Sequence, residues 1–342
     1  MFALGIDIGG SSVKVAVCAG DAAAHLTRSG AYTCPDGEAV MVAVAEALSM
    51  LPAGSPSPSP QSPGQAVSVG VCAPGLVDEA RGVVLASANL PALVGFPLGQ
   101  RVRALVEARG WRVERVAFLP DAHAAAFDAW ATRTSPAPRT PPTSPAPPGP
   151  PVERLLALSI GTGVGACVLD AAADGGMPTR LLVSGGSSGH LGQMDVGFDE
   201  AGPGGAVTSG PVGRDGAVGS LEAYIGLAGL RARYGADVEA ALPRLTANDA
   251  PVRALVRGLR IAHAIYRPNA IVLLGGIGVR LRHLGPALHA AVAQSLTSLA
   301  RPGWTLEFGH DDHHAARGAA MWGARGGAGA WPAQTSTRGG LV

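Results

Sequence analysis

The chain has 342 residues, of which 47% are hydrophobic and 15% are charged, and its formal net charge is +1 at pH 7. This composition describes a folded protein with room for two hydrophobic cores, and it excludes a disordered chain. The charge balance provides no basic surface for nucleic acid or an anionic membrane, and no apolar run approaches the ~20 residues of a membrane span, so we expect a small-molecule partner.

Two segments, one in each half of the chain, have the same organisation. Leu4–Cys18 reads LGIDIGGSSVKVAVC and Leu155–Leu169 reads LLALSIGTGVGACVL. Each is typical of an apolar strand, a turn of glycines and hydroxyl residues, and a second apolar strand. Glycine turns expose backbone N–H groups that bind anions. The repeat therefore predicts a duplicated fold whose two turns face each other across a cleft and hold a polyphosphate group.

The segments around these hairpins alternate between the strand and helix periods. In the first half we expect helices over Gly37–Leu51, Leu98–Ala108 and Ala122–Trp130 and strands over Ala66–Cys72 and Val113–Leu119. In the second half we expect helices over Leu221–Gly235, Pro251–Ile265 and Ala315–Gly323 and a strand over Ala270–Leu274, which leads into Gly275–Gly278. This alternation predicts an α/β architecture with ligands at the carboxyl ends of the strands.

Two proline-rich segments, Pro52–Gln65 and Thr134–Pro151, interrupt the globular pattern. The first predicts a disordered insertion in a loop, and the second is either an interdomain linker or a surface insertion. We therefore expect an N-terminal α/β domain over 1–133, a segment over 134–151, a C-terminal α/β domain over 152–330 and a flexible tail over 331–342. The final helix, about 315–325, is a candidate to pack on the N-terminal domain.

The cysteines Cys18, Cys34, Cys72 and Cys167 are scattered without a CxxC pair. Three of them lie in apolar, strand-like runs, which indicates reduced, buried side chains. The N-terminus has no basic leader before an apolar stretch. We therefore expect a cytoplasmic protein.

Asp7 and Lys14 are candidate functional residues of the first hairpin. Asp7 precedes Gly9 and Gly10, where its carboxylate can hold Mg²⁺ or bond its own turn. Lys14 is the only lysine of the chain, so either chance retained it or its ammonium serves phosphate groups.

Asp121 ends the strand Val113–Leu119 after Pro120 and opens the next helix. A carboxylate there can cap the helix, or it can accept the proton of an attacking hydroxyl during phosphoryl transfer. The two roles are compatible only if the second carboxylate oxygen faces the cleft.

The run His310-Asp311-Asp312-His313-His314 has the composition of a metal site. Imidazoles at adjacent positions do not easily converge on one ion. We therefore expect a solvated loop that caps the following helix.

Seven sequence features, taken in order, resemble those of the ROK (repressor, open reading frame, kinase) sugar kinases of the actin-like ATPase superfamily. They are Asp7–Ser12, Ala73–Gly75 with Val77–Asp78, Ala88–Pro91, Asp121–Ala125, Gly161–Gly165, Ser220–Glu222, and Pro268–Val272 leading into Gly275 and Gly276. The resemblance spans nearly the whole chain apart from the proline-rich segments. It implies a duplicated ribonuclease-H-like fold of two domains flanking a central cleft, and usually a homodimer.

The resemblance also implies a reaction, in which the γ-phosphoryl group of ATP passes to the 6-hydroxyl of a hexose, with Asp121 as the general base. It assigns Asn89, His190 and Glu222, together with Asp121, to sugar binding. Phosphate and nucleotide binding with Mg²⁺ near Asp7 is assigned to Asp7, Gly9, Gly10, Ser11, Ser12, Lys14, Gly161, Thr162, Gly163, Gly275 and Gly276. Polyphosphate is an alternative donor, because Lys14 after the first turn also resembles polyphosphate-using relatives.

The departures from the family pattern lie in the sugar pocket. Pro120 replaces an amide, His190 a glutamate and Gln193 a zinc-binding histidine, and no cysteine cluster lies between Gln193 and Glu222. We therefore predict no zinc. Two lost hydroxyl partners weaken sugar binding roughly 5- to 150-fold. The alternative to an active kinase is thus a weak or inactive nucleotide- and sugar-binding protein. A DNA-binding repressor is disfavoured, because the first strand starts at Phe2 and the chain has no basic face.

Overall fold

The computed structural model describes residues 2–19, 22–33, 36–51, 66–134, 152–173, 177–183, 186–198, 200–201, 207–208, 210–214 and 216–326. The predicted insertion over 52–65, residues 135–151, the predicted tail over 331–342 and Cys34 lie outside this part of the chain. The domain boundaries proposed around 134–151 therefore stay a prediction.

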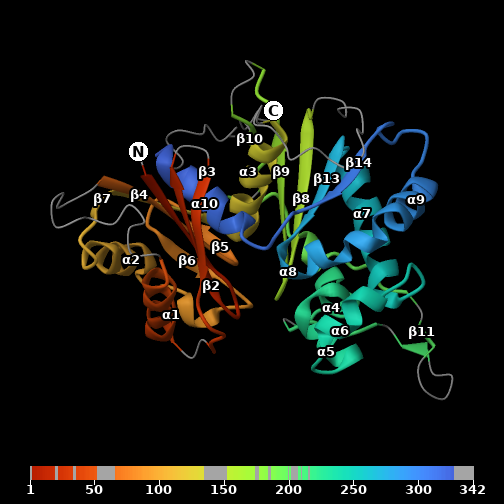
Figure 1. Ribbon diagram of the computed structural model, residues 1–342. Helices are drawn as coiled ribbons and strands as arrows, with labels where there is room; N and C mark the ends of the chain where they lie inside the picture. Colours follow the sequence, from red (N-terminus) through yellow and green to blue (C-terminus); the bar gives the residue numbers. More distant parts are fainter. Residues whose placement is uncertain are drawn as a thin grey trace, which may run out of the picture.

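Two sheets of five strands form the framework, and they have the same topology (Figure 1). The first has the order β3-β2-β1-β4-β7 and contains β1 (Phe2–Ile8), β2 (Val13–Ala19), β3 (Ala22–Arg28), β4 (Ala66–Ala73) and β7 (Arg112–Pro120). The second has the order β10-β9-β8-β13-β14 and contains β8 (Arg154–Ile160), β9 (Val164–Asp170), β10 (Thr179–Arg180), β13 (Ala270–Leu274) and β14 (Thr305–Phe308). In both, an antiparallel hairpin is extended by two parallel strands. The predicted duplication and α/β class are confirmed.

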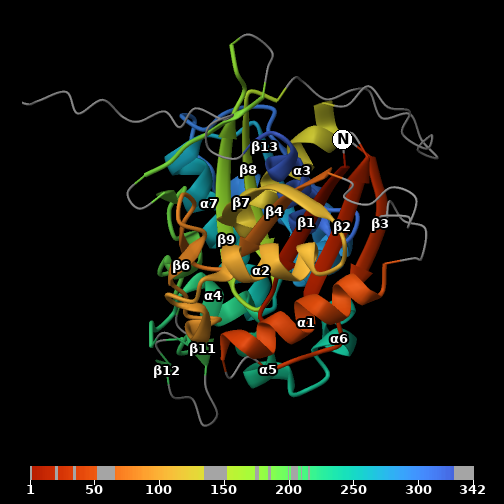
Figure 2. The ribbon, with the colours of Figure 1, turned by 90° about the vertical axis from the view of Figure 1, so that its left-hand side faces the viewer.

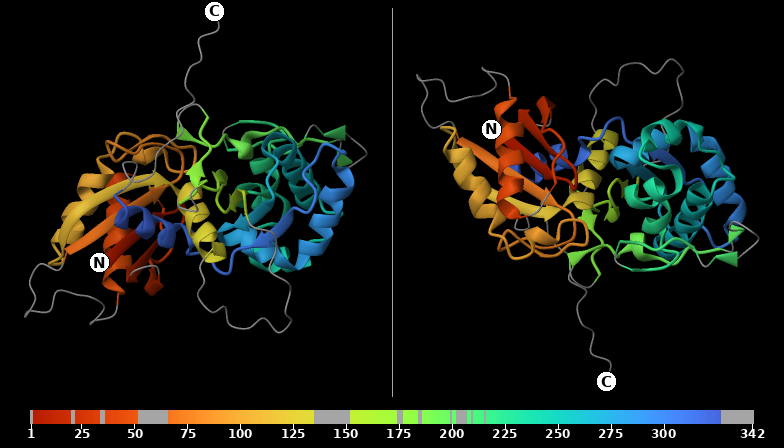
Figure 3. Two further views of the ribbon diagram at one scale, coloured as in Figure 1. Left: turned by 90° about the horizontal axis from the view of Figure 1, so that it is seen from above. Right: turned by 90° about the horizontal axis from the view of Figure 1, so that it is seen from below.

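Helices cover both sheets and also lie between them (Figure 3). In the first half, α1 (Gly37–Ser49) and α2 (Leu98–Glu107) cover the outer face of the sheet, which Figure 2 turns toward the viewer. Between the sheets lie α3 (Asp121–Thr134) and α10 (His314–Ala324). The second half also contains α4 (Leu221–Ile225), α5 (Leu227–Tyr234), α6 (Val238–Ala241), α7 (Ala250–Tyr266), α8 (Gly275–Gly278) and α9 (Gly285–Ser295). None of the helices in the described ranges has the length and apolar character that a membrane span requires.

The alternation of side chains along β1 assigns its two faces to different partners. Leu4, Ile6 and Ile8 join the core beneath α1 and α2. Ala3 on the opposite face packs with Ala316 and Ala320 of α10. Asp7 has the same parity as Ala3 and therefore projects from the side of the sheet that faces the second half of the molecule.

Helix α10 approaches its neighbours through glycines. A methyl group built on Gly5 of β1 would lie 1.8 Å from the carbonyl oxygen of Ala316, and one on Gly70 of β4 would lie 1.7 Å from that of Ala319. In α10 itself, a methyl group on Gly318 would lie 1.7 Å from the carbonyl oxygen of Ala124 in α3. Backbone therefore packs directly on backbone, and no larger residue fits without displacing the helix.

The predicted helix Leu221–Gly235 is wrong as a single element, because it is broken at Gly226 into α4 and α5. Gly226 has extended backbone angles, φ −68° and ψ 159°. After the break, the N–H of Leu227 donates to the carbonyl oxygen of Gly161 over 3.0 Å instead of continuing the helix. The N–H of Leu227 therefore bonds the second glycine turn and not the preceding helix. This contact is distant in the sequence, so the local pattern does not indicate it.

Several short elements were not predicted, namely β3, β10 and β14 and the hairpin of β5 (Leu76–Asp78) and β6 (Val83–Ala86). A further two-stranded ladder joins β11 (Glu200–Ala201) and β12 (Val207–Thr208). Short 3-10 helices occur at Pro91–Leu93, Leu191–Gln193, Leu242–Arg244 and Val279–Leu284. The other predicted helices and strands are confirmed to within a few residues at each end.

The packing of α10 predicts that Gly318→Ala destabilises the protein. Helix propensity alone would raise the free energy of unfolding by about 1 kcal/mol, whereas the overlap with Ala124 should lower it by about 1–3 kcal/mol. Denaturant unfolding distinguishes the two signs. Gly99→Ala is the matched control, because Gly99 also lies in a helix, α2, and its methyl group would make only an ordinary contact of 3.5 Å with Gly82. A stabilised Gly318→Ala variant would contradict the close packing.

Candidate functional site

A cleft of about 560 Å³ is lined by residues from both halves of the chain. Every candidate site residue that the sequence indicated lines this one cleft: Asp7, Gly9, Gly10, Ser11, Ser12, Lys14, Asn89, Asp121, Gly161, Thr162, Gly163, His190, Glu222, Gly275 and Gly276. The structure thus brings together residues that are up to 269 positions apart.

The two glycine turns touch each other inside the cleft. A methyl group built on Gly10 would lie 3.0 Å from both Oγ1 and Cγ2 of Thr162. The first turn is closed by the N–H of Gly9, which donates to Ser12 over 3.1 Å, and the second by the N–H of Gly161, which donates to Gly163 over 2.9 Å. The remaining N–H groups of two adjoining turns form a concave surface of the kind that binds phosphate groups.

Asp7 and Lys14 face each other at the start of this surface. They are cross-strand partners in the first hairpin, and Nζ of Lys14 lies 3.4 Å from Oδ2 of Asp7. The corresponding pair in the second hairpin is Ser159 and Gly165. The duplicated halves therefore differ in charge at this position, and only the first carries an acid and a base.

The missing side chain at Gly165 admits the start of α3. A methyl group there would lie 2.8 Å from Cβ of Ala122 and 3.8 Å from Oδ1 of Asp121. The glycine of the second hairpin thus makes room for the Asp121 carboxylate, which directly follows β7 in the first half.

Asp121 begins α3 with one oxygen engaged. Its Oδ1 accepts the N–H of the adjacent residue Ala122 over 2.7 Å, within the first turn of the helix. Burial raises the pKa of Asp121 to about 6, the nearby charge of Asp7 adds to this rise, and the Ala122 N–H and Lys14 oppose it. A carboxyl group with such a pKa takes up and releases protons near neutral pH, as a general base must.

Asn89 and Glu222 converge over Gly163 at the side of the second turn. A methyl group built on Gly163 would lie 2.5 Å from Nδ2 of Asn89 and 2.6 Å from Oε2 of Glu222. The same Oε2 accepts the N–H of Val164 over 2.8 Å. The Oδ1 atom of Asn89 is buried, and no described residue donates to it. A buried acceptor without a donor is costly, so this atom indicates a place for a ligand hydroxyl or amine.

The three departures noted in the sequence also line the cleft: Pro120, His190 and Gln193. His190 is exposed, and among the described residues its ring has no hydrogen-bond partner. It can therefore turn toward a ligand, but no residue of the described ranges orients it.

The glycines after β13 form the far end of the cleft. A methyl group on Gly275 would lie 2.5 Å from the carbonyl oxygen of Ile160, just before the second turn. Arg280 donates to the carbonyl oxygen of Gly276 and pairs with Glu239 over 3.2 Å. Arg280 and Glu239 line the cleft but were not among the candidates from the sequence.

Comparison with solved structures identifies the architecture. The ROK hexokinase of Thermus thermophilus superposes with a TM-score of 0.59 at 23% identity, covering 94% of this chain and 97% of that chain. A ROK family glucokinase from Streptomyces griseus, solved with glucose and AMPPNP, gives 0.61 at 19% identity, covering 95% of this chain and 100% of that chain.

The chain has the ROK kinase fold.

A ROK family transcriptional regulator, a homologue of the E. coli MLC protein, shares this ROK fold at a TM-score of 0.61 and 16% identity, covering 94% of this chain and 78% of that chain. No protein-family model matches the sequence, and neither does any curated protein. At these identities the likeness establishes the ROK fold, and the activity has to be argued from the cleft.

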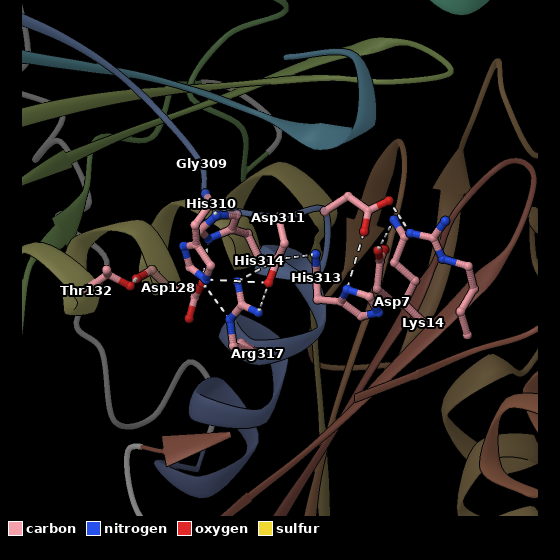
Figure 4. A network of polar contacts seen from close by, with 12 residues as sticks. Asp7, Lys14, Asp128, Thr132, Gly309, His310, Asp311, His313, His314 and Arg317 are labelled. Atoms are coloured by element: carbon pink, nitrogen blue, oxygen red, sulfur yellow. Dashed lines mark hydrogen bonds and ion pairs between the residues drawn. The ribbon is translucent and has the colours of Figure 1, made fainter. Parts of the chain in front are cut away.

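Helices α3 and α10 of this ROK fold are joined by a polar network beside the cleft (Figure 4). Oδ2 of Asp128 in α3 lies 2.5 Å from Nδ1 of His314 and 3.0 Å from Nε of Arg317, both in α10. Arg317 makes two further bonds of 2.9 Å to the carboxylate of Asp311. The network fixes the start of α10 against the middle of α3.

The expectation of a solvated loop over His310–His314 that caps the next helix is confirmed only in part, because residues 310–313 form a loop in which His310 is exposed, but His314 belongs to α10. His314 is buried, with 3% of its surface exposed, and His313 at the start of α10 makes no side-chain capping bond. The segment instead supplies Asp311 and His314 to the network. The partner that buries His314, Asp128, is 186 residues away in the sequence, so the local pattern did not indicate it.

Asp128, His310 and His314 bring three possible metal ligands within 4.8 Å of one another. They do not fit an ion as arranged. Nδ1 of His314 already bonds Asp128, and its Nε2 accepts the N–H of His310 over 3.1 Å. Two atoms that bind one zinc ion lie ~3 Å or more apart, whereas Nδ1 of His314 lies 2.5 Å from Oδ2 of Asp128. The guanidinium of Arg317, which bonds the same carboxylate, would also repel a cation.

The same loop contributes Asp312 to the cleft, a position that the sequence analysis did not assign to it. Asp312 pairs with Arg28, and Arg28 is the cross-strand neighbour of Lys14 in β3. Arg28 and Asp312 both line the cleft. If β3 had been predicted, the strand pairing would have placed Arg28 beside Lys14. The contact of Asp312 with Arg28 could not be predicted in this way, because the two residues are far apart in the sequence.

The charges around Asp121 predict how its pKa responds to substitution. Lys14→Met removes a positive charge and should raise the pKa of Asp121 above 6, whereas Asp7→Asn removes a negative charge and should lower it. Lys14→Arg keeps the charge and is the control. Carboxyl ¹³C NMR titration measures all four proteins. Shifts in the same direction for Lys14→Met and Asp7→Asn would contradict this electrostatic description.

Proposed function

We propose that this chain is a sugar kinase of the ROK family, which transfers the γ-phosphoryl group of ATP to the 6-hydroxyl of a hexose. The observation that carries the proposal is the position of Asp121, a carboxylate with a pKa of about 6, in the same cleft as two touching glycine turns. A phosphoryl transfer needs both a phosphate-binding surface and an acceptor for the hydroxyl proton.

In the reaction, the free oxygen of Asp121 accepts the proton of the sugar hydroxyl. The hydroxyl oxygen forms a bond to the γ-phosphorus while the bond between that phosphorus and the β–γ bridging oxygen breaks, so the products are a sugar phosphate and ADP. The bond from the Ala122 N–H holds Oδ1, which leaves Oδ2 as the oxygen that faces the sugar. Asp121 orients the nucleophile as well as deprotonating it.

The glycine turns and Lys14 bind the phosphate groups in this proposal. Backbone N–H groups of Gly10–Ser12 and of Thr162–Gly163 donate to phosphate oxygens, and the ammonium of Lys14 adds a positive charge. Mg²⁺ would neutralise charge on the phosphate oxygens. Asp7 is the candidate ligand for such an ion. In the described structure its carboxylate contacts the Lys14 ammonium at 3.4 Å and the Cys72 thiol at 3.7 Å, so Lys14 would have to turn to a phosphate group when the cation binds. One carboxylate with phosphates and waters is a usual Mg²⁺ environment.

Sugar binding falls to Asn89, Glu222, His190 and Asp121. The unpaired Oδ1 of Asn89 accepts from a sugar hydroxyl, and so does the carboxylate of Glu222. The thiols of Cys18, Cys72 and Cys167 are buried and form no disulfide with one another, in keeping with a cytoplasmic enzyme. The homodimer and the absence of zinc stay predictions.

We expect turnover to depend on the carboxylate of Asp121. Asp121→Asn should lower kcat roughly 100- to 10,000-fold while leaving ATP affinity unchanged, because the amide keeps the shape but does not accept the proton. A coupled assay of ADP release over D-glucose, D-mannose and N-acetylated hexosamines measures this. Undiminished turnover in the Asn variant would refute the assigned base.

We also expect sugar binding to depend on the space above Gly163. The methyl group of Gly163→Ala would displace Asn89 and Glu222, so sugar affinity should fall about 10-fold or more. Gly161→Ala is the matched control in the same turn, because its methyl group would meet nothing within 4 Å. Calorimetry compares the two variants. Equal losses of sugar affinity in the two variants would mean that any change in the turn weakens binding, and that Asn89 and Glu222 are not responsible.

A second candidate is a protein that binds nucleotide and sugar without turnover. Pro120 beside Asp121 and the unoriented ring of His190 favour it, because both remove sugar contacts that the resemblance implies. The same assay decides between the two, with polyphosphate included as an alternative donor. Nucleotide binding without product from any sugar or donor would support the second candidate.

A further inference from the structure

His123 lies in the cleft two residues after Asp121, and one of its ring nitrogens is already bound. The side chain is 1% exposed and lines the cleft. Its Nδ1 lies 3.2 Å from Nη1 of Arg180. A guanidinium only donates hydrogen bonds, so Nδ1 must accept, and the neutral ring then carries its proton on Nε2. Nε2 is the nitrogen left for a ligand in the cleft.

Arg180 itself is held by two residues, Glu79 and Trp322. Nη2 donates to Oε2 of Glu79 over 3.1 Å, Nη1 donates to Oε1, and the guanidinium lies 4.8 Å from the centre of the Trp322 ring. Arg180 comes from β10 at the edge of the second sheet, whereas Glu79 follows β5 in the first half. The ring of His123 is therefore oriented by an ion pair that joins the two halves of the molecule.

Burial and the charge of Arg180 on β10 keep His123 neutral. The other titratable groups in this region are Asp121 on its own helix, Glu79 after β5 and Cys167 on β9, and a negative charge on either carboxylate would act in the opposite direction. Burial lowers the pKa of His123 to about 3, and the charge of Arg180 adds to this effect. Burial also raises the pKa of Cys167 to about 12, so that its thiol stays neutral. At neutral pH the ring is thus an uncharged donor of one tautomer.

We propose that His123 binds the sugar, its Nε2–H donating to a hydroxyl or ring oxygen, and that Arg180 and Glu79 are positioning residues that hold this donor in place. The inference rests on the proposed kinase function. Asp121, Glu222 and Oδ1 of Asn89 all accept, so an uncharged sugar needs a donor in the cleft for its own acceptor oxygens. His123 supplies one, and it replaces a donor that the proline at position 120 does not offer.

Nitrogen-15 NMR of the histidine rings in the sugar-free protein tests the donor directly. We expect His123 to be neutral and protonated on Nε2 from about pH 5 to pH 8. In the double variant Glu79→Gln/Arg180→Met, which removes both members of the ion pair, we expect a mixture of tautomers and a titration at higher pH. A proton on Nδ1, or a charged ring near pH 6, in the wild-type protein would overturn the proposal.

Calorimetry with D-glucose, D-mannose and N-acetyl-D-glucosamine tests the contact with sugar. His123→Ala should weaken binding of the sugar that the wild type binds about 5- to 20-fold without changing ATP affinity. His123→Gln, whose side-chain N–H reaches the position of Nε2, should restore affinity to within about 3-fold. Unchanged binding by the Ala variant, or no rescue by Gln, would overturn the sugar contact while the kinase function stands. A wild-type protein that binds none of the three sugars would instead refute the kinase function together with the sugar role of His123, and the tautomer result would be unaffected.

Discussion

The contact of α10 with β1, β4 and α3 is the constraint on which the cleft depends. Gly5, Gly70 and Gly318 let backbone meet backbone at these crossings. Asp121 is the first residue of α3 and Asp312 lies two residues before α10, so the packing of the two helices fixes how these carboxylates lie relative to each other. The Asp128 network and the stacked rings of Phe127 and Trp322, with centroids 5.2 Å apart, hold the same pair of helices together.

Duplication explains the shape of the cleft, and divergence between the copies explains its chemistry. The same strand order in both halves brings two equivalent turns to one place. The first hairpin has Asp7 and Lys14 where the second has Ser159 and Gly165. The first hairpin thus supplies charged side chains, and the second supplies space at Gly165, where the start of α3 with Asp121 fits. Two identical hairpins would not provide both.

Much of this arrangement could be predicted from the sequence, because the glycine turns, the end of β7 and the strand before Gly275 are local patterns. The missing parts depend on partners far away in the chain. Arg180 sits on a two-residue strand, and its partner Glu79 is 101 positions away. Gly226 breaks a helix because of a carbonyl group in another turn. The residues that precede His314 in the sequence are typical of a loop, but His314 is buried against Asp128 of α3. Periodicity carries no information on such pairs.

The solitary lysine has a practical consequence. Lys14 is the only side-chain amine among 342 residues, and it lies in the cleft with 15% of its side chain exposed. Amine-directed reagents therefore have a single side-chain target, apart from the N-terminus, and that target adjoins the anion-binding turns. Acylation of this amine, followed by mass spectrometry, reports whether the cleft is occupied, and isotopic labelling of lysine gives one spectroscopic signal that belongs to the cleft alone.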